Sequence, residues 1–228
     1  PGPVMQLKKN YGEIGLGEQL HITATDPGFA KDVVAWCKIT GASLLSVENK
    51  AGVIHATIEK TESQNQNKMI SNGDNKTFIV FSDDLDKALA SFVIANGAAS
   101  TGKKVSMFFT FWGLNVIKKR EKPSVAKDIF GKMFGMMLPS HSGKLKLSKL
   151  NMGGAGSWMM RLIMKNKKIS SLEELMQQAV DNGVEMIACT MSMDVMGVKE
   201  EELLDNVVYG GVASYLERAE ESNVNLFI

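Results

Sequence analysis

The sequence predicts an α/β protein of two domains, an N-terminal two-layer α/β sandwich and a C-terminal domain built on a parallel sheet. Residues 18–25 alternate apolar and polar side chains, as a half-buried strand does. From residue 76 onward, apolar strands alternate with helices, which is typical of a parallel sheet with right-handed connections. Between these regions, residues 61–75 are polar and nearly free of large apolar side chains. Such a stretch buries too little surface to offset its ordering entropy, so we predict a flexible linker there.

The linker separates a domain over residues 1–60 from one over residues 76–228. In the first domain Pro3 suits the opening turn of a helix, and Asp26 is the expected N-cap of a second helix that ends at Gly41. The predicted elements are helix 3–12, strand 18–25, helix 26–41, and strands 44–48 and 53–59 around a turn at 49–52.

One face of the second helix is apolar, because Phe29, Val33, Trp36 and Cys37 recur at spacings of three to four residues. We therefore predict that Cys37 is a core residue rather than a reactive one.

The C-terminal domain begins with a continuous apolar strand, which suits a sheet that is covered on both faces. Acidic residues open the helix that follows, and they favour the positive end of its dipole. Ser170 or Ser171 is the expected cap of a later helix. The predicted strands are 76–82, 104–111, 185–189 and 224–228, and the predicted helices are 83–100, 173–182 and 210–222.

Composition narrows the class of protein. The chain has 228 residues and a net charge of +1, so no overall field favours nucleic acid or a membrane. Two cysteines form no disulfide framework, which predicts a reducing, cytoplasmic compartment. The sequence holds neither a secretory signal nor an apolar run of about 18 residues. Two cysteines far apart and three scattered histidines give no metal-ligand spacing, so we expect no metal site.

The charge is distributed unevenly. Residues 118–168 hold 13 Lys and Arg against 2 Asp and Glu, whereas residues 169–228 hold 2 against 12. Twelve of the 15 methionines lie between Met133 and Met196. We interpret residues 118–168 as a basic, Met-rich insertion in the C-terminal domain.

Cys189 is the candidate reactive residue. It ends an apolar strand, and parallel α/β sheets bind ligands beyond the carboxyl ends of their strands. The thiolate is the nucleophile, and a helix N-terminus stabilises it. We expect residues 199–205 to begin a helix that faces the loop after Cys189. Asp194 would oppose ionisation unless it is turned away, and His141 could exchange a proton with the thiol. The alternatives are that Cys189 is a buried apolar residue and that His141 is a solvated loop residue.

The insertion allows three interpretations. Its glycines at residues 153–156 precede a helix, and backbone amides there could hold an anion such as a coenzyme A phosphate. The methionines and cations could instead contact a protein partner or a lipid headgroup layer. The third interpretation is that the methionines pack in the core or in an oligomer interface. The candidate anion-binding residues are Lys144, Lys146, Lys149 and Arg161.

Three motifs in residues 1–60 resemble the TusA/SirA-like sulfur-carrier domains. They are Pro1-Gly2-Pro3, Ala24-Thr25-Asp26-Pro27-Gly28 and Trp36-Cys37-Lys38-Ile39-Thr40-Gly41. In that family a cysteine directly before the first proline carries a persulfide, and here that position falls before residue 1. We therefore expect the chain to be one module of a longer or processed polypeptide, with a first strand upstream.

Residues 76–228 resemble the DsrE/DsrF-like sulfur-relay family, in the branch that carries a Met-rich insertion. The shared motifs are Phe111-Trp112-Gly113-Leu114, the run from Ala188 to Gly197 (Ala-Cys-Thr-Met-Ser-Met-Asp-Val-Met-Gly), and Gly210-Gly211-Val212-Ala213. The resemblance implies that Cys189 is a sulfur-accepting cysteine. It also implies a flavin-dependent disulfide or persulfide reductase domain in the same chain, and we expect a homo-oligomer.

Two hypotheses of function follow. In the first, the chain is a carrier rather than a complete enzyme, without a cofactor of its own. It would pass sulfane sulfur between Cys189 and the thiols of a donor and an acceptor, either proteins or coenzyme A-like molecules. In the second, the insertion docks on a protein partner or a membrane surface, and Cys189 is structural. Nucleotide binding has little support, because no phosphate-binding motif occurs.

Overall fold

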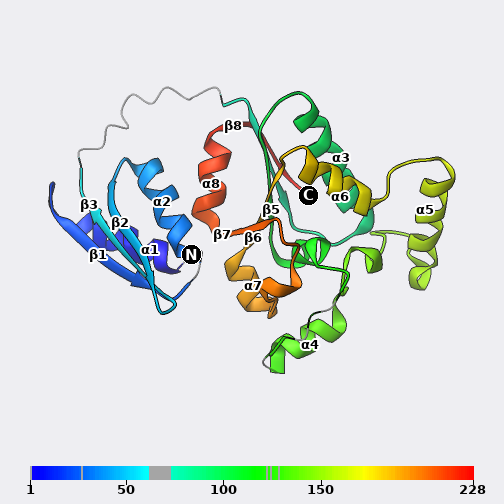
Figure 1. The fold of residues 1–228 in the computed structure, drawn as a ribbon, viewed down its shortest axis with the longest axis horizontal. Coiled ribbons are helices and arrows are strands. Elements are labelled where there is room, and N and C mark those ends of the chain that lie inside the picture. Colours follow the sequence, from blue (N-terminus) through cyan, green and yellow to red (C-terminus); the bar gives the residue numbers. More distant parts are fainter. Residues whose placement is uncertain (1, 27, 62–72, 122, 124, 128) are drawn as a thin grey trace. The chain divides into compact units, whose positions relative to one another are not determined.

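The computed structural model describes residues 2–26, 28–61, 73–121, 123, 125–127 and 129–228. It divides into two compact units, residues 1–73 together with 209–223, and residues 74–208 together with 224–228 (Figure 1). Most of the predicted linker, residues 62–72, lies outside the described residues. Among the helices that are described, none combines the length and apolar character needed to cross a membrane.

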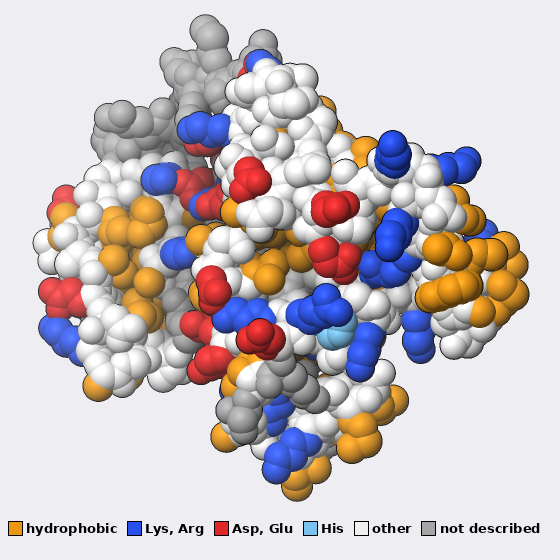
Figure 2. All heavy atoms as spheres, turned by 45° about the vertical axis from the view of Figure 1, so that its right-hand side comes forward, with side chains coloured by type: hydrophobic (Ala, Val, Ile, Leu, Met, Phe, Trp, Pro, Cys, Tyr) orange, Lys and Arg blue, Asp and Glu red, His pale blue; other side chains and the backbone are white. Residues whose placement is uncertain are grey.

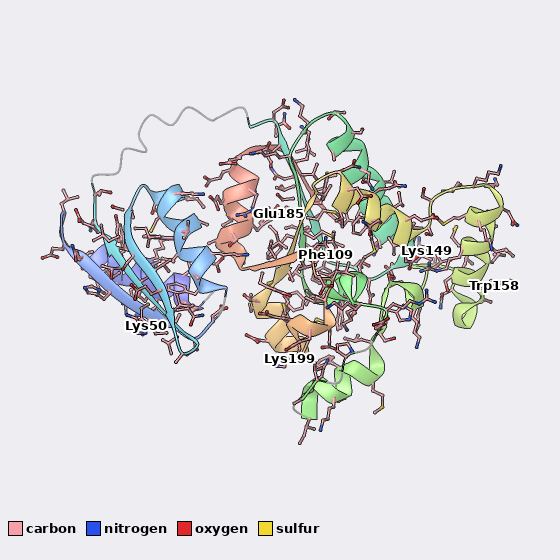
Figure 3. All side chains as sticks on the ribbon, viewed as in Figure 1. Lys50, Phe109, Lys149, Trp158, Glu185 and Lys199 are labelled. Atoms are coloured by element: carbon pink, nitrogen blue, oxygen red, sulfur yellow. The ribbon has the colours of Figure 1, made fainter. Side chains whose placement is uncertain are left out.

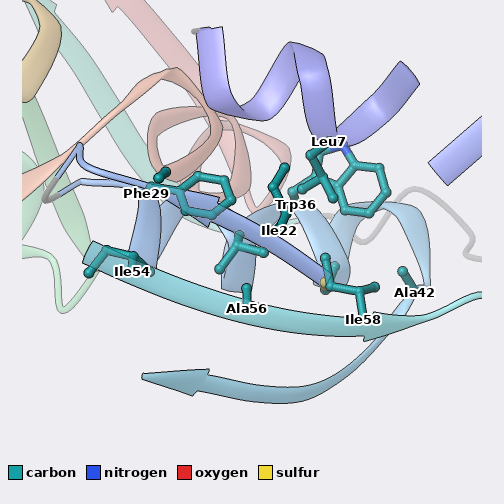
Figure 4. Packing of buried hydrophobic residues seen from close by; sticks show 11 residues of the cluster. Leu7, Ile22, Phe29, Trp36, Ala42, Ile54, Ala56 and Ile58 are labelled. Atoms are coloured by element: carbon teal, nitrogen blue, oxygen red, sulfur yellow. The ribbon is translucent and has the colours of Figure 1, made fainter. Parts of the chain in front are cut away.

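The first unit is a two-layer α/β sandwich, as predicted. Its antiparallel sheet has the strand order β1-β3-β2, and its first two helices pack on that sheet. Along β3, Ile54, Ala56 and Ile58 are buried at alternate positions and meet Phe29 and Trp36 in the core (Figure 4). The elements are α1 (Gly2–Glu13), β1 (Gln19–Ala24), α2 (Phe29–Thr40), β2 (Ser43–Lys50) and β3 (Val53–Glu59).

The start of α2 differs from the prediction. Gly28, not Asp26, occupies the N-cap position, and the Asp26 carboxylate instead accepts a hydrogen bond of 2.8 Å from the Gly28 amide. Asp26 therefore closes a local turn two residues before the N-cap, which is a common alternative to capping for this side chain. The predicted stop is confirmed, because Gly41 ends α2 in the left-handed conformation at φ 78°.

Helix α8 (Val212–Glu220) belongs to the first unit and packs along α2. The buried Asp32 carboxylate accepts hydrogen bonds from the Gly211 amide at 2.9 Å and from the Ser214 amide and hydroxyl at 3.2 and 2.7 Å. Asp32 thereby satisfies amides at the start of α8 that have no partner within the helix.

A five-stranded sheet in the order β7-β6-β5-β4-β8 forms the centre of the second unit. The pairs β4–β5 and β5–β6 are parallel, which confirms the predicted fold class. Helices α3 (Leu85–Ser100) and α6 (Leu172–Asp181) pack on each other. The strands are β4 (Asn75–Val80), β5 (Val105–Phe109), β6 (Glu185–Cys189), β7 (Val207–Gly210) and β8 (Ser222–Phe227). Strand β7 was not predicted, because four residues are too few to show a periodicity.

Capping residues fix the bounds of α6. Ser171, one of the two expected caps, accepts a hydrogen bond from the Glu174 amide, and the Glu174 carboxylate accepts one from the Ser171 amide. This reciprocal pair is a capping box, and it satisfies two amides that the helix leaves free.

The strand predicted over residues 104–111 ends at Phe109, where the chain turns sharply. Phe111 has a positive φ of 48°, and the 3-10 helix η2 (Phe111–Ile117) follows. Gly113 comes so close to β4 that an added Cβ would lie 2.0 Å from the Val80 carbonyl oxygen. This approach explains why the segment needs a glycine.

The basic, Met-rich insertion forms two helices, α4 (Ile129–Met137) and α5 (Ala155–Asn166), with short 3-10 turns between them (Figure 1). As predicted, the glycine-rich turn leads into a helix. Gly154 has a φ of 106° directly before α5, and Gly156 packs against the backbone of Leu150.

Candidate functional site

Cys189 is the last residue of β6 and lies at the carboxyl edge of the parallel sheet. Ala188 pairs with Phe109 of β5, whose position at the centre of the sheet Figure 3 shows. Thr110 follows Phe109 as Cys189 follows Ala188, so the ends of the two strands bring Thr110 and Cys189 to the same edge. Ligands of parallel α/β proteins bind at this edge.

The chain continues from Cys189 directly into a helix, not into the predicted loop. Helix α7 (Thr190–Met196) begins at the next residue, with Cys189 in its N-cap position. Met193 and Met196, spaced by three residues, are buried, and Gly197 ends the helix at φ 61°. The amide dipoles of α7 therefore begin at Cys189, and such dipoles favour negative charge at the start of a helix.

The helix predicted over residues 199–205 is wrong. Only a 3-10 turn, Glu200–Glu202, forms there. Glu202 is held by two contacts, a hydrogen bond from the Lys199 amide at 2.9 Å and a buried ion pair with Lys127 at 2.6 Å. These contacts hold the segment against the insertion in place of a helix.

The Cys189 thiol is free, but its residue is only 2% exposed. The Thr110 and Ser192 hydroxyls lie 2.7 Å apart and join the end of β5 to the first turn of α7. The Thr190 hydroxyl is buried and has no hydrogen-bond partner within the described part of the chain. The thiol is therefore enclosed by ordered structure at the edge of the sheet.

A second cluster of polar side chains lies after β4, the strand on the other side of β5 from β6. The Asn115 amide donates a hydrogen bond of 2.9 Å to the Asp83 carboxylate, and the Lys118 ammonium donates one of 2.6 Å to the Asn115 oxygen. Burial raises the pKa of Asp83, and the hydrogen bond from Asn115 opposes this shift. Asn115 and Lys118 are themselves buried.

Sequence reasoning missed Asp83 and Thr110 as parts of this edge. A usable signal was present for Asp83, which follows the predicted strand 76–82; Thr110 was placed inside the predicted strand 104–111, which in the structure ends at Phe109. Asn115 and Lys118 carry no such signal, because they reach the edge only through the turn at η2.

His141 belongs to a different group of side chains. Its Nδ1 accepts a hydrogen bond of 3.0 Å from the Gly143 amide. The adjacent Ser142 hydroxyl donates to Glu173 at 2.7 Å, and the Arg161 guanidinium bridges Glu173 at 3.1 Å and the Ser142 carbonyl at 2.8 Å. Partial burial, followed by the positive charge of Lys144, holds the pKa of His141 below its usual range.

The described contacts do not join either predicted auxiliary residue to Cys189. His141 binds its own loop, and Asp194 is an exposed residue of α7. Of the candidate anion-binding residues, Arg161 is already paired with Glu173, whereas Lys144, Lys146 and Lys149 are exposed and form no ion pair within the described residues. Arg161 is thus held by a carboxylate, whereas the three lysines face solvent.

Cys37 lies in the core of the first unit, as predicted. It is 4% exposed, and burial raises the pKa of its thiol to about 11. In the part of the chain that the structure describes, no group of three or more His, Cys, Asp or Glu side chains could hold a metal ion. Cys189 is thus the cysteine whose position at a sheet edge suits chemistry.

The fold and the site define an α/β protein with one thiol at the carboxyl edge of a parallel sheet. The family model described as the DsrE/DsrF/DrsH-like family matches residues 73–227, and that of the sulfurtransferase TusA matches residues 1–60. The chain belongs to the DsrE/DsrF/DrsH-like family and carries a TusA domain at its N-terminal end.

Individual relatives agree with this assignment. The YrkE protein of Bacillus subtilis is 47% identical over 152 residues, which are 67% of this chain and 95% of YrkE. The sulfur carrier protein DsrE2 of Allochromatium vinosum is 38% identical over 148 residues, 63% of this chain and 91% of DsrE2. The sulfur carrier protein TusA of the same organism is 38% identical over 61 residues, 27% of this chain and 80% of TusA. Both parts of the chain are thus similar to sulfur carriers, which supports sulfur transfer in general.

Proposed function

We propose that this chain is a persulfide carrier and that Cys189 holds the sulfur that it transfers. The observation that carries the proposal is the position of Cys189, the last residue of a parallel strand and the N-cap of the helix that follows. The similarity to named sulfur carriers supports the same chemistry.

The transfer is a thiol exchange without net oxidation. The Cys189 thiolate attacks the outer sulfur of a donor persulfide, the S–S bond of the donor breaks, and a new S–S bond forms on Cys189. The donor leaves as a thiolate. In the second step an acceptor thiolate attacks the outer sulfur on Cys189, which returns as a thiolate. No cofactor of this chain enters either step.

Burial of the thiol sets a condition on this mechanism. Because Cys189 is 2% exposed, donor and acceptor reach it only after a local opening of the groups around it. Partners would be proteins or small thiols that bind at the carboxyl edge of the sheet. The reductase domain that the sequence led us to expect remains a prediction.

The test is intact-protein mass spectrometry after incubation with glutathione persulfide, followed by peptide mapping. We expect a gain of about 32 Da per sulfur atom at Cys189 that a reductant reverses. The Cys189→Ser variant should gain no sulfur, and the matched Cys37→Ser variant should load as the unchanged chain does. If Cys189 stays unmodified while a TusA carrier is loaded in the same mixture, Cys189 is a structural residue.

A further inference from the structure

Helix α5 carries an apolar face that no part of the described chain covers. Four of its residues, at spacings of one and four, point to one side of the helix and are between 40% and 67% exposed. We name them the α5 apolar face: Trp158, Met159, Leu162 and Ile163. Met164, on the opposite side of the helix, is buried against the protein. A helix that is apolar on both sides is expected where a second apolar medium covers it.

The apolar surface extends beyond the helix at both ends. Leu150 and Met152, before α5, are 80% and 64% exposed, and Ile169, after it, is 53% exposed. Figure 2 shows hydrophobic side chains, in orange, gathered at the right of the view, and Figure 3 places Trp158 on α5 at the outer edge of the second unit. Monomeric proteins rarely expose such a continuous patch unless it binds something.

Cations surround this surface. Three lie before α5, one belongs to its last turn and two follow it, and Figure 2 shows blue side chains at the margin of the orange patch. All are exposed, and none forms an ion pair within the described residues. These cations are Lys144, Lys146, Lys149, Lys165, Lys167 and Lys168.

The arrangement favours one occupant over others. A bilayer with anionic lipids offers phosphates to the lysines and an acyl layer to the apolar side chains, and Trp residues prefer this interface. Each lysine near such a surface adds to the electrostatic attraction. A second copy paired through the same face would bring its six lysines against these six, and such like-charge contacts weaken association.

We propose that this protein docks on anionic lipid membranes through α5, with the α5 apolar face inserted among the headgroups and the six lysines on the phosphates. The helix lies along the surface and does not span it. Docking places the DsrE-like domain, with Cys189, at the membrane surface. The proposal does not depend on sulfur loading of Cys189.

The test is co-sedimentation of the full chain with phosphatidylcholine vesicles that contain or lack phosphatidylglycerol. We expect binding to the anionic vesicles, weakened by about 1 M salt, and little binding to the neutral ones. Trp158→Glu and Leu162→Glu should each reduce binding at least tenfold. Leu16→Glu is the matched control, because Leu16 is 63% exposed in the first unit, and this variant should bind as the unchanged chain does.

Fluorescence supplies a second readout that does not require a charge change. Lipids with brominated acyl chains should quench the emission of Trp158, and the Trp158→Phe variant should bind the vesicles but lose that quenching. Failure to sediment with anionic vesicles would overturn the proposal and favour an acidic protein as the occupant. Equal vesicle binding by Trp158→Glu and the unchanged chain would also overturn it. So would a chain that self-associates through this face and binds no vesicles, with the self-association lost in Trp158→Glu.

Discussion

Cys37 provides a quantitative test of the claim that only one of the two cysteines is suited to reaction. It lies in the core of the first unit, beside Trp36, and among the described residues no polar group offsets the loss of hydration of its thiolate. Burial raises the pKa of the Cys37 thiol from 9.0 to about 11. Near pH 8, about one Cys37 thiol in a thousand is then ionised, roughly one-hundredth of the share at a pKa of 9.0.

Because the thiolate is the reactive form, alkylation should slow in the same proportion. The Cys189→Ala variant leaves Cys37 as the one thiol of this chain. We expect its folded form to react with iodoacetamide near pH 8 at least about a hundredfold more slowly than the same variant unfolded in urea. Steric burial slows the reaction further, so this ratio is a lower limit. Mass spectrometry of timed samples gives both rates.

The pH dependence separates the two causes. If ionisation controls the rate, it should rise about tenfold for each pH unit up to the pKa. A folded-state rate within about threefold of the unfolded one would refute the reasoning, because Cys37 would then be accessible and ionised like an ordinary thiol.

Three further predictions concern stability. Ser171→Ala removes the capping box of α6 and should lower the free energy of unfolding by about 1 kcal/mol in urea denaturation, whereas an unchanged midpoint would contradict the role of this cap. Phe109→Ala empties a fully buried position on β5 and should cost about 3–5 kcal/mol by the same measurement; a loss below about 1 kcal/mol would show that the site collapses without a cavity. The pKa of His141 is lowered, so the unfolded chain binds this proton more readily, and stability should fall as the pH decreases below about 6.5. His141→Gln should remove that part of the pH dependence, and identical profiles for the two proteins would contradict it.

Much of the fold follows from local patterns. The alternation along β3 and the helical spacing along α2 each bury one face, and these periods are visible in a single sequence. The cap at Ser171 and the stop at Gly41 follow from the chemistry of single residues. These periodicities and caps, together with the family motifs, were enough to predict both domain types.

Errors concentrate where two local arrangements compete, or where a distant contact overrides a local preference. Asp26 can cap a helix or close a turn, and the turn prevails with Gly28 at the N-cap. The acidic segment after Lys199 could begin a helix, but the buried Lys127–Glu202 ion pair holds one of its carboxylates against the insertion. A single sequence does not show which distant cation will form an ion pair with a given carboxylate.

For the candidate site, the sequence by itself determined that Cys189 ends an apolar strand and that a glycine-rich turn in the basic, Met-rich insertion precedes a helix. Only the tertiary structure decided that the thiol is enclosed, that His141 binds its own loop, and that one face of α5 stays open. Periodicity records which side chains leave water. It does not show which element these side chains pack against, because that depends on contacts between residues far apart in the chain.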